Sequence, residues 1–131
     1  MKSYGIYDEE LSQSKPIGYL FYYEKAREFV IELSSDIDEW QAPLLFQGLV
    51  SRGTYTIPKE VALMWVQERI IPSGRQNIGE ILKRHKLKEY SEIALLSLSN
   101  GRCSQDACYI KEMNEKDVPK DIKDRWLNNV L

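Results

Sequence analysis

Cysteine and histidine are scarce in this chain of 131 residues, which contains two cysteines and one histidine. A structural zinc site takes four ligands, most often Cys and His side chains, so one copy of the chain cannot build a closed site from these residue types. Two cysteines are too few for a disulfide-bonded scaffold, and Cys103 and Cys108 lack the Cys-x-x-Cys spacing of thioredoxin-like redox pairs. We therefore expect no metal and no other cofactor.

Long apolar runs and an excess of one charge are also missing. The longest apolar candidate, residues 42–50, is interrupted by Gln47 and is shorter than the ~20 residues of a membrane-spanning helix. No apolar segment follows residues 1–5, so we expect neither a membrane helix nor a secretory signal, and a cytoplasmic location. The net charge of −2 disfavours nucleic-acid binding through bulk charge.

Familiar catalytic motifs are absent from the sequence. It contains no Gly-x-Ser-x-Gly, no phosphate-binding glycine loop and no dinucleotide-binding fingerprint. His85, the single histidine, lies among basic residues that disfavour its protonation. Binding is therefore a better expectation than catalysis. A small metal-independent enzyme acting on RNA, with His85 or a tyrosine as its proton-transfer group, stays as an alternative.

What the sequence does contain is typical of one folded domain over residues 1–131, with 43% hydrophobic and 29% charged residues. Residues 17–23 and 29–33 are rich in aromatic and β-branched side chains, and residues 24–28 between them have the length of a hairpin loop. Residues 4–7 can add a third strand. Because a lone hairpin is only marginally stable, these strands must pack on helices from the rest of the chain.

Two helices are expected in the middle of the chain. Pro43 begins a segment with apolar residues at helical spacing that ends near Gly53. Pro58 begins a second helix, which is apolar on almost all sides and ends at Pro72, so we expect it to be central.

Three further helices and one strand are expected after Pro72. Ser73 and Gln76 have the spacing of a capping box, which predicts a helix that starts at Ser73. Residues 91–99 fit a helix or a core strand, and their leucine and alanine content favours the helix. Residues 107–110 resemble a strand. A last helix begins near residues 118–119, with Ile122, Trp126 and Val130 on one side.

These elements predict an α+β fold, in which a small antiparallel sheet with an amino-terminal aromatic hairpin packs against four to five helices. One candidate partner-binding surface is the aromatic strand, represented by Tyr19, Tyr22 and Tyr23. Burial of that strand on both faces is the structural alternative. A second candidate is the polar loop after residue 100, where Arg102, Gln105 and Asp106 offer a donor fork, an amide and an acceptor. The structural alternative is a loop that caps its own backbone.

Basic residues gather on the segment that follows Pro72, and they are a candidate nucleic-acid contact: Arg75, Lys83, Arg84, Lys86 and Lys88. The alternative is that they complement the carboxyl end of a helix dipole. Because the charges are balanced and catalytic motifs are absent, we favour a non-enzymatic binding or regulatory protein. It would act through a protein partner or through self-association, for example as a dimer. A nucleic-acid-associated protein is the second expectation.

Overall fold

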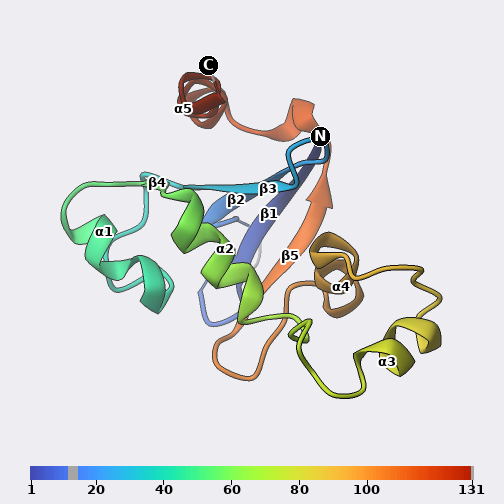
Figure 1. Ribbon diagram of the computed structural model, residues 1–131. Helices are drawn as coiled ribbons and strands as arrows, with labels where there is room; N and C mark the ends of the chain where they lie inside the picture. The colour runs from blue at the N-terminus through green and yellow to red at the C-terminus, as the bar shows by residue number, and fades with distance from the viewer. Residues whose placement is uncertain (12–14, 131) are drawn as a thin grey trace.

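The computed structural model describes residues 1–11 and 15–130, with the backbone alone for residues 126–130 (Figure 1). The strands are β1 (Lys2–Asp8), β2 (Gly18–Tyr23), β3 (Glu28–Leu33), β4 (Thr56–Ile57) and β5 (Cys108–Met113). The α-helices are α1 (Gln47–Ser51), α2 (Lys59–Gln67), α3 (Ile78–Arg84), α4 (Glu92–Ser99) and α5 (Lys120–Val130). Two 3-10 turns, η1 (Leu44–Phe46) and η2 (Glu115–Asp117), precede α1 and α5. These elements confirm the α+β prediction and its amino-terminal hairpin.

The strands form one antiparallel sheet in the order β4-β3-β2-β1-β5. β1 therefore lies inside the sheet, with β2 on one side and the last strand of the chain on the other. Tyr4 pairs with Leu20 of β2, and Ile6 pairs with Ile110 of β5. β4 pairs with β3 over two residues and is followed by Pro58, which has no amide to continue the ladder. The two outer strands are thus β4 and β5.

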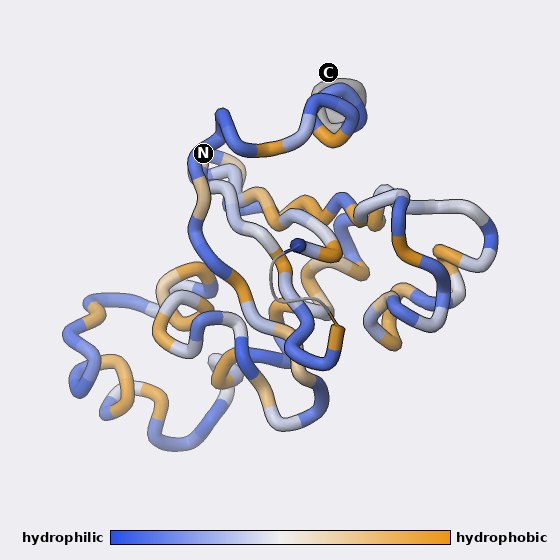
Figure 2. Tube along the Cα trace, turned by 180° about the vertical axis from the view of Figure 1, so that it is seen from behind, coloured by the Kyte–Doolittle hydropathy of each residue, from blue (hydrophilic) through white to orange (hydrophobic). Residues whose placement is uncertain are grey.

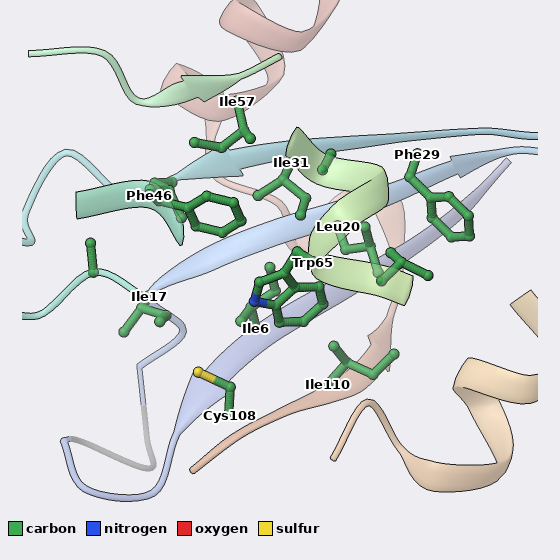
Figure 3. Close-up of a cluster of buried hydrophobic side chains, with 14 of the residues drawn as sticks. Ile6, Ile17, Leu20, Phe29, Ile31, Phe46, Ile57, Trp65, Cys108 and Ile110 are labelled. Atoms are coloured by element: carbon green, nitrogen blue, oxygen red, sulfur yellow. The ribbon is translucent and has the colours of Figure 1, made fainter. Parts of the chain in front are cut away.

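Side chains of successive strand residues point to opposite faces of the sheet. Both faces contain buried side chains. On one face, Ile6, Leu20 and Ile31 are fully buried beneath α2, where Trp65 packs on them (Figure 3). On the other face, Phe21 packs with Val118 and Ile122 at the start of α5. Figure 1 shows α2 and α5 on opposite sides of the sheet.

The central position of α2 follows from its apolar side chains, of which Ala62, Trp65 and Val66 are buried. Two details of the prediction were wrong. The helix ends at Gln67 rather than at Pro72, and Met64 is half exposed, so one side of the helix faces solvent.

The helix predicted to start at Ser73 starts at Ile78, so the capping-box prediction was wrong. Residues 73–77 form turns, and Asn77 is the N-cap residue of α3 without a side-chain cap hydrogen bond. The cause is the composition of the first predicted turn. Gly74 disfavours a helix, and no apolar side chain is available for burial before Ile78.

Residues 91–99 are helical, as their composition predicted. Ser91 accepts a hydrogen bond from the Ala94 amide at 3.3 Å and so caps α4. Asn100 and Gly101, at φ of 54° and 71°, end the helix in the left-handed conformation. The chain then enters β5, which extends the predicted strand to Met113.

The carboxyl-terminal helix is present, and Ile122 is buried as expected. The expectation for the side chains of Trp126 and Val130 lies outside the described residues. No helix in the described residues has the length and apolar character that crossing a membrane requires.

Candidate functional site

The aromatic strand is largely covered, which matches the structural alternative for it. Tyr19 is buried against α5, and Tyr22 packs on Phe29 with ring centroids 4.8 Å apart on the α2 side. Burial raises the pKa of the Tyr19 and Tyr23 hydroxyls above the ordinary value. Tyr23 is half buried and contributes, with Val30 and Ile57, to a groove of about 840 Å³. The three tyrosines therefore point to two faces of the sheet rather than forming one exposed surface.

Asp106 was predicted to contact a partner, but its carboxylate forms contacts within the protein. Its Oδ2 lies 2.5 Å from Nη2 of Arg69, which follows the carboxyl end of α2 and has a fully buried side chain. Its Oδ1 accepts a hydrogen bond from the Cys108 amide at 3.0 Å. The Arg69 guanidinium also lies 3.7 Å from the centre of the Trp65 ring. Asp106 therefore joins the loop before β5 to the core.

Arg102 and Gln105 lie at the surface of the same loop. Arg102 pairs with Glu9 at 2.6 Å and stacks over the ring of Tyr109 at 4.5 Å. Tyr109 in turn stacks on Tyr7 of β1, with ring centroids 5.5 Å apart. The loop thus separates into a structural residue, Asp106, and two exposed residues that remain candidates for contact.

The basic segment projects from the body of the protein, and hydrophilic residues cover much of its trace (Figure 2). Residues 73–92 carry five basic and three acidic side chains. Lys83 and Arg84 occupy the last turn of α3, where cations complement the helix dipole. All five candidate cations are exposed, and none forms an ion pair within the described part of the chain: Arg75, Lys83, Arg84, Lys86 and Lys88.

The side chains that could take part in catalysis or metal binding are separated in the structure. His85 ends α3 and is exposed, and its ring forms no hydrogen bond or ion pair with the described residues. Cys108 is buried, and this burial raises the pKa of its thiol to about 12. Within residues 1–11 and 15–125, no three His, Cys, Asp or Glu side chains are arranged to hold a metal ion.

A buried polar cluster under α5 was not anticipated from the sequence. Glu32 of β3 is fully buried, and its Oε2 accepts a hydrogen bond from Oγ1 of Thr56 at 2.7 Å. Arg125 of α5 approaches the same oxygen at 3.7 Å and donates to the Leu33 carbonyl at 2.5 Å. A buried carboxylate requires such partners. We assign this cluster to holding β3, β4 and α5 together.

The most exposed large apolar side chains lie elsewhere, in the segment between β3 and α1, and they were not predicted from the sequence. Trp40 is 78% exposed and Leu44 is 84% exposed. Tryptophan is highly buried on average in folded proteins, so the exposure of Trp40, four residues before a second exposed apolar residue, indicates a contact surface. The available signal was a tryptophan in residues 34–41, where Ile37 is the only other apolar residue.

These two side chains are held by an ordered turn, which we call the Trp40 turn (residues 37–44). Oδ1 of Asp38 accepts hydrogen bonds from the Trp40 and Gln41 amides, each at 3.0 Å. Oε1 of Gln41 accepts from the Asp38 amide at 3.0 Å in return. Ile37 and Ala42, on either side, are buried in the core. The Trp40 side chain therefore projects from a turn whose two sides are fixed.

The sequence at and just before the Trp40 turn is acidic. Asp36, Asp38 and Glu39 immediately precede Trp40, whereas residues 36–51 contain no lysine or arginine. Asp36 forms an ion pair with Lys15 at 3.7 Å, but both side chains are about three-quarters exposed, so solvent screens this pair. The turn thus combines an exposed apolar pair with an acidic border.

Comparison with known proteins adds no assignment to this surface. No protein-family model, no curated protein and no solved structure matches the chain.

Proposed function

We propose that this protein is a non-enzymatic binding domain that docks on another protein through the Trp40 turn. The observation that carries the proposal is the exposure of Trp40 and Leu44 on a turn fixed at both ends. A rigid aromatic side chain loses little conformational freedom on binding, which is why tryptophan is enriched among residues that dominate binding energy.

The charge of the turn indicates the kind of partner. Trp40 and Leu44 fit an apolar pocket, and the acidic border of Asp36 and Glu39 complements a basic rim around that pocket. A second copy of this chain is a poorer partner, since a two-fold contact through this turn would bring the same acidic residues together. We therefore propose a different protein with a basic-rimmed apolar pocket.

The test compares Trp40→Ala with Met64→Ala, which truncates another exposed apolar side chain, on α2. Both variants should unfold within about 0.5 kcal/mol of the wild type, because neither side chain is buried. The three proteins serve as baits for quantitative affinity purification from the native host. Candidates that Trp40→Ala alone fails to retain are purified and titrated directly.

The expected result is a purified protein whose affinity falls by about 2–4 kcal/mol in Trp40→Ala, or roughly 30- to 1000-fold, and stays unchanged in Met64→Ala. Sedimentation of the chain alone tests the second copy as the partner. Partners retained equally by the wild type and Trp40→Ala, or a dimer that dissociates in Trp40→Ala, would contradict the proposal.

The cations of the projecting segment support a second candidate function, contact with nucleic acid. These five exposed cations form no ion pair with the described residues, and they can neutralise phosphates and release counterions. The test is fluorescence anisotropy with a labelled 20-nucleotide RNA and a 20-base-pair DNA at two salt concentrations. The test variant is Lys83→Ala/Arg84→Ala/Lys86→Ala. Its control is a triple alanine variant that removes three cations elsewhere, Lys25, Arg27 and Lys120. Equal effects of the two triple variants, or no binding at low salt, would rule this function out.

A further inference from the structure

The outer edge of β5 is an open strand edge, distant in sequence from the Trp40 turn. In an antiparallel pair the backbone groups of alternate residues point toward the neighbouring strand or away from it. The Glu9 amide bonds to the Ala107 carbonyl, and the Ile110 amide bonds to the Asn100 carbonyl at 2.8 Å on the opposite side. The backbone amides and carbonyls of the odd-numbered residues of β5 therefore point toward β1. Those of the even-numbered residues point toward the open edge.

The outward amides at the start of β5 are bonded, whereas the outward groups toward its end are open. The Cys108 amide bonds to Asp106, and the Ile110 amide bonds to Asn100. Beyond that point, the carbonyl of Ile110 and both backbone groups of Glu112 have no hydrogen-bond partner among the described residues. These three groups extend over about 7 Å of strand, at about 3.4 Å per residue. They form a short row that another strand can pair with.

A groove of about 520 Å³ lies along this edge. It is lined by Tyr109 and Lys111, which point to one face of the sheet, and by Ile110 and Glu112, which point to the other. A groove that reaches side chains on both faces of one strand must lie along the edge of that strand. Ser97 and Asn100 of the α4 region form its far wall, and Figure 1 shows α4 beside β5.

We propose that the β5 edge groove binds an extended peptide segment of a partner, which adds a sixth strand to the sheet. The carbonyl of Ile110 and both backbone groups of Glu112 supply the pairing, as in other cases of strand addition. Arg102 and Lys111 border the groove on one face, and Lys111 has no carboxylate partner among the described residues. An acidic side chain of the peptide would meet Lys111, since Arg102 is already paired with Glu9, whereas a small side chain would face Ser97.

A second copy of β5 is a poorer occupant of the groove. A two-fold antiparallel pair centred on Glu112 would place the two Glu112 side chains opposite each other, and like charges at that position destabilise a sheet. This binding surface is additional to the Trp40 turn and does not depend on the function proposed for it.

The experiment selects 12-residue peptides from a random library displayed on phage, with the whole chain as the target. Synthetic copies of the selected peptides are then titrated against three variants. Glu112→Pro removes the outward amide without removing a hydrogen bond to β1 and should weaken binding at least about tenfold. Glu112→Ala keeps that amide and should bind within about twofold of the wild type. Trp40→Ala should bind like the wild type.

A second measurement avoids any effect of the proline on folding. Methylation of alternate backbone amides of the peptide should abolish binding in one register and be tolerated in the other, because a paired strand has one bonded side. The proposal predicts selected peptides that carry an acidic residue and show this alternation. Failure to select any peptide, equal binding to Glu112→Pro and wild type, or tolerance of methylation in both registers would overturn it.

Discussion

Replacing Asp106 by asparagine tests the contact that joins the α4–β5 loop to the core. The Arg69 side chain is fully buried, whereas that of Asp106 is 32% exposed. Asp106→Asn preserves an acceptor for the Cys108 amide but leaves a buried guanidinium whose remaining carboxylate, in Glu68, is 3.6 Å away. An uncompensated buried charge costs about 3–5 kcal/mol. We expect about 3 kcal/mol here, because Glu68 and water from the exposed side compensate in part.

The reverse substitution should cost less. Arg69→Met removes the buried charge itself, together with an Nε that has no hydrogen-bond partner in the described residues, and keeps an unbranched stem on Trp65. Asp106 can then hydrate, since a third of its side chain is exposed. We expect a loss of about 1 kcal/mol, and the double variant should be close to Arg69→Met alone.

The assay is urea unfolding followed by circular dichroism, on the wild type, both single variants and the double variant. A loss of about 3 kcal/mol corresponds to a decrease in Tm of roughly 10 °C for a domain of this size. Glu68→Gln is the control and should change stability by less than about 0.5 kcal/mol. A cost for Arg69→Met equal to that of Asp106→Asn, or additive effects in the double variant, would refute the reasoning.

Three further predictions concern thiols, tyrosines and glycines. At pH 8, a thiol reagent should modify half-buried Cys103 quickly and Cys108 only after unfolding, because Cys108 is buried and its pKa is raised to about 12; two fast equivalents would contradict this. Burial raises the pKa of tyrosines such as Tyr23, so the folded protein keeps protons that the unfolded chain releases near pH 10. The free energy of unfolding should therefore fall as the pH rises above about 10, and urea midpoints that stay constant from pH 9 to 11 would contradict this prediction. Gly101→Ala should destabilise the fold by about 1–3 kcal/mol, because φ is +71° and the new Cβ would lie 3.1 Å from Ile110. Gly79→Ala is its control, since nothing lies within 4 Å of a Cβ there, and thermal unfolding should show a gain of up to about 1 kcal/mol.

Local sequence patterns correctly predicted the strands and helices whose packing in the fold follows the same pattern. The aromatic run before residue 24 forms β2, and Ser91 and Asn100 cap α4 as their residue types suggest. The start of α3 was wrong because a capping box contributes only about 1 kcal/mol. It cannot offset a first turn that contains Gly74 and has no apolar side chain to bury.

The candidate sites were harder to predict, because exposure depends on neighbours that are distant in the sequence. Tyr19 and Trp40 are both aromatic residues, yet Tyr19 is buried by α5, about a hundred residues later, whereas no element covers Trp40 among the described residues. The sequence shows Asp106 only as a polar loop residue, and it is the turn after α2 that places Arg69 beside it. Residue type thus indicated which side chains could take part in recognition, and the topology determined which remain exposed.

The position of β1 between β2 and β5 has a consequence during synthesis of the chain. β1 and β2 emerge from the ribosome early, but β5 follows β1 by about a hundred residues, which takes about 5–20 s at ordinary rates of translation. During that time the β5-facing edge of β1, with Gly5 and Tyr7, is unpaired in a chain whose sheet is otherwise able to form. Nascent chains that stall before residue 108 should therefore be prone to edge-to-edge association and to capture by chaperones.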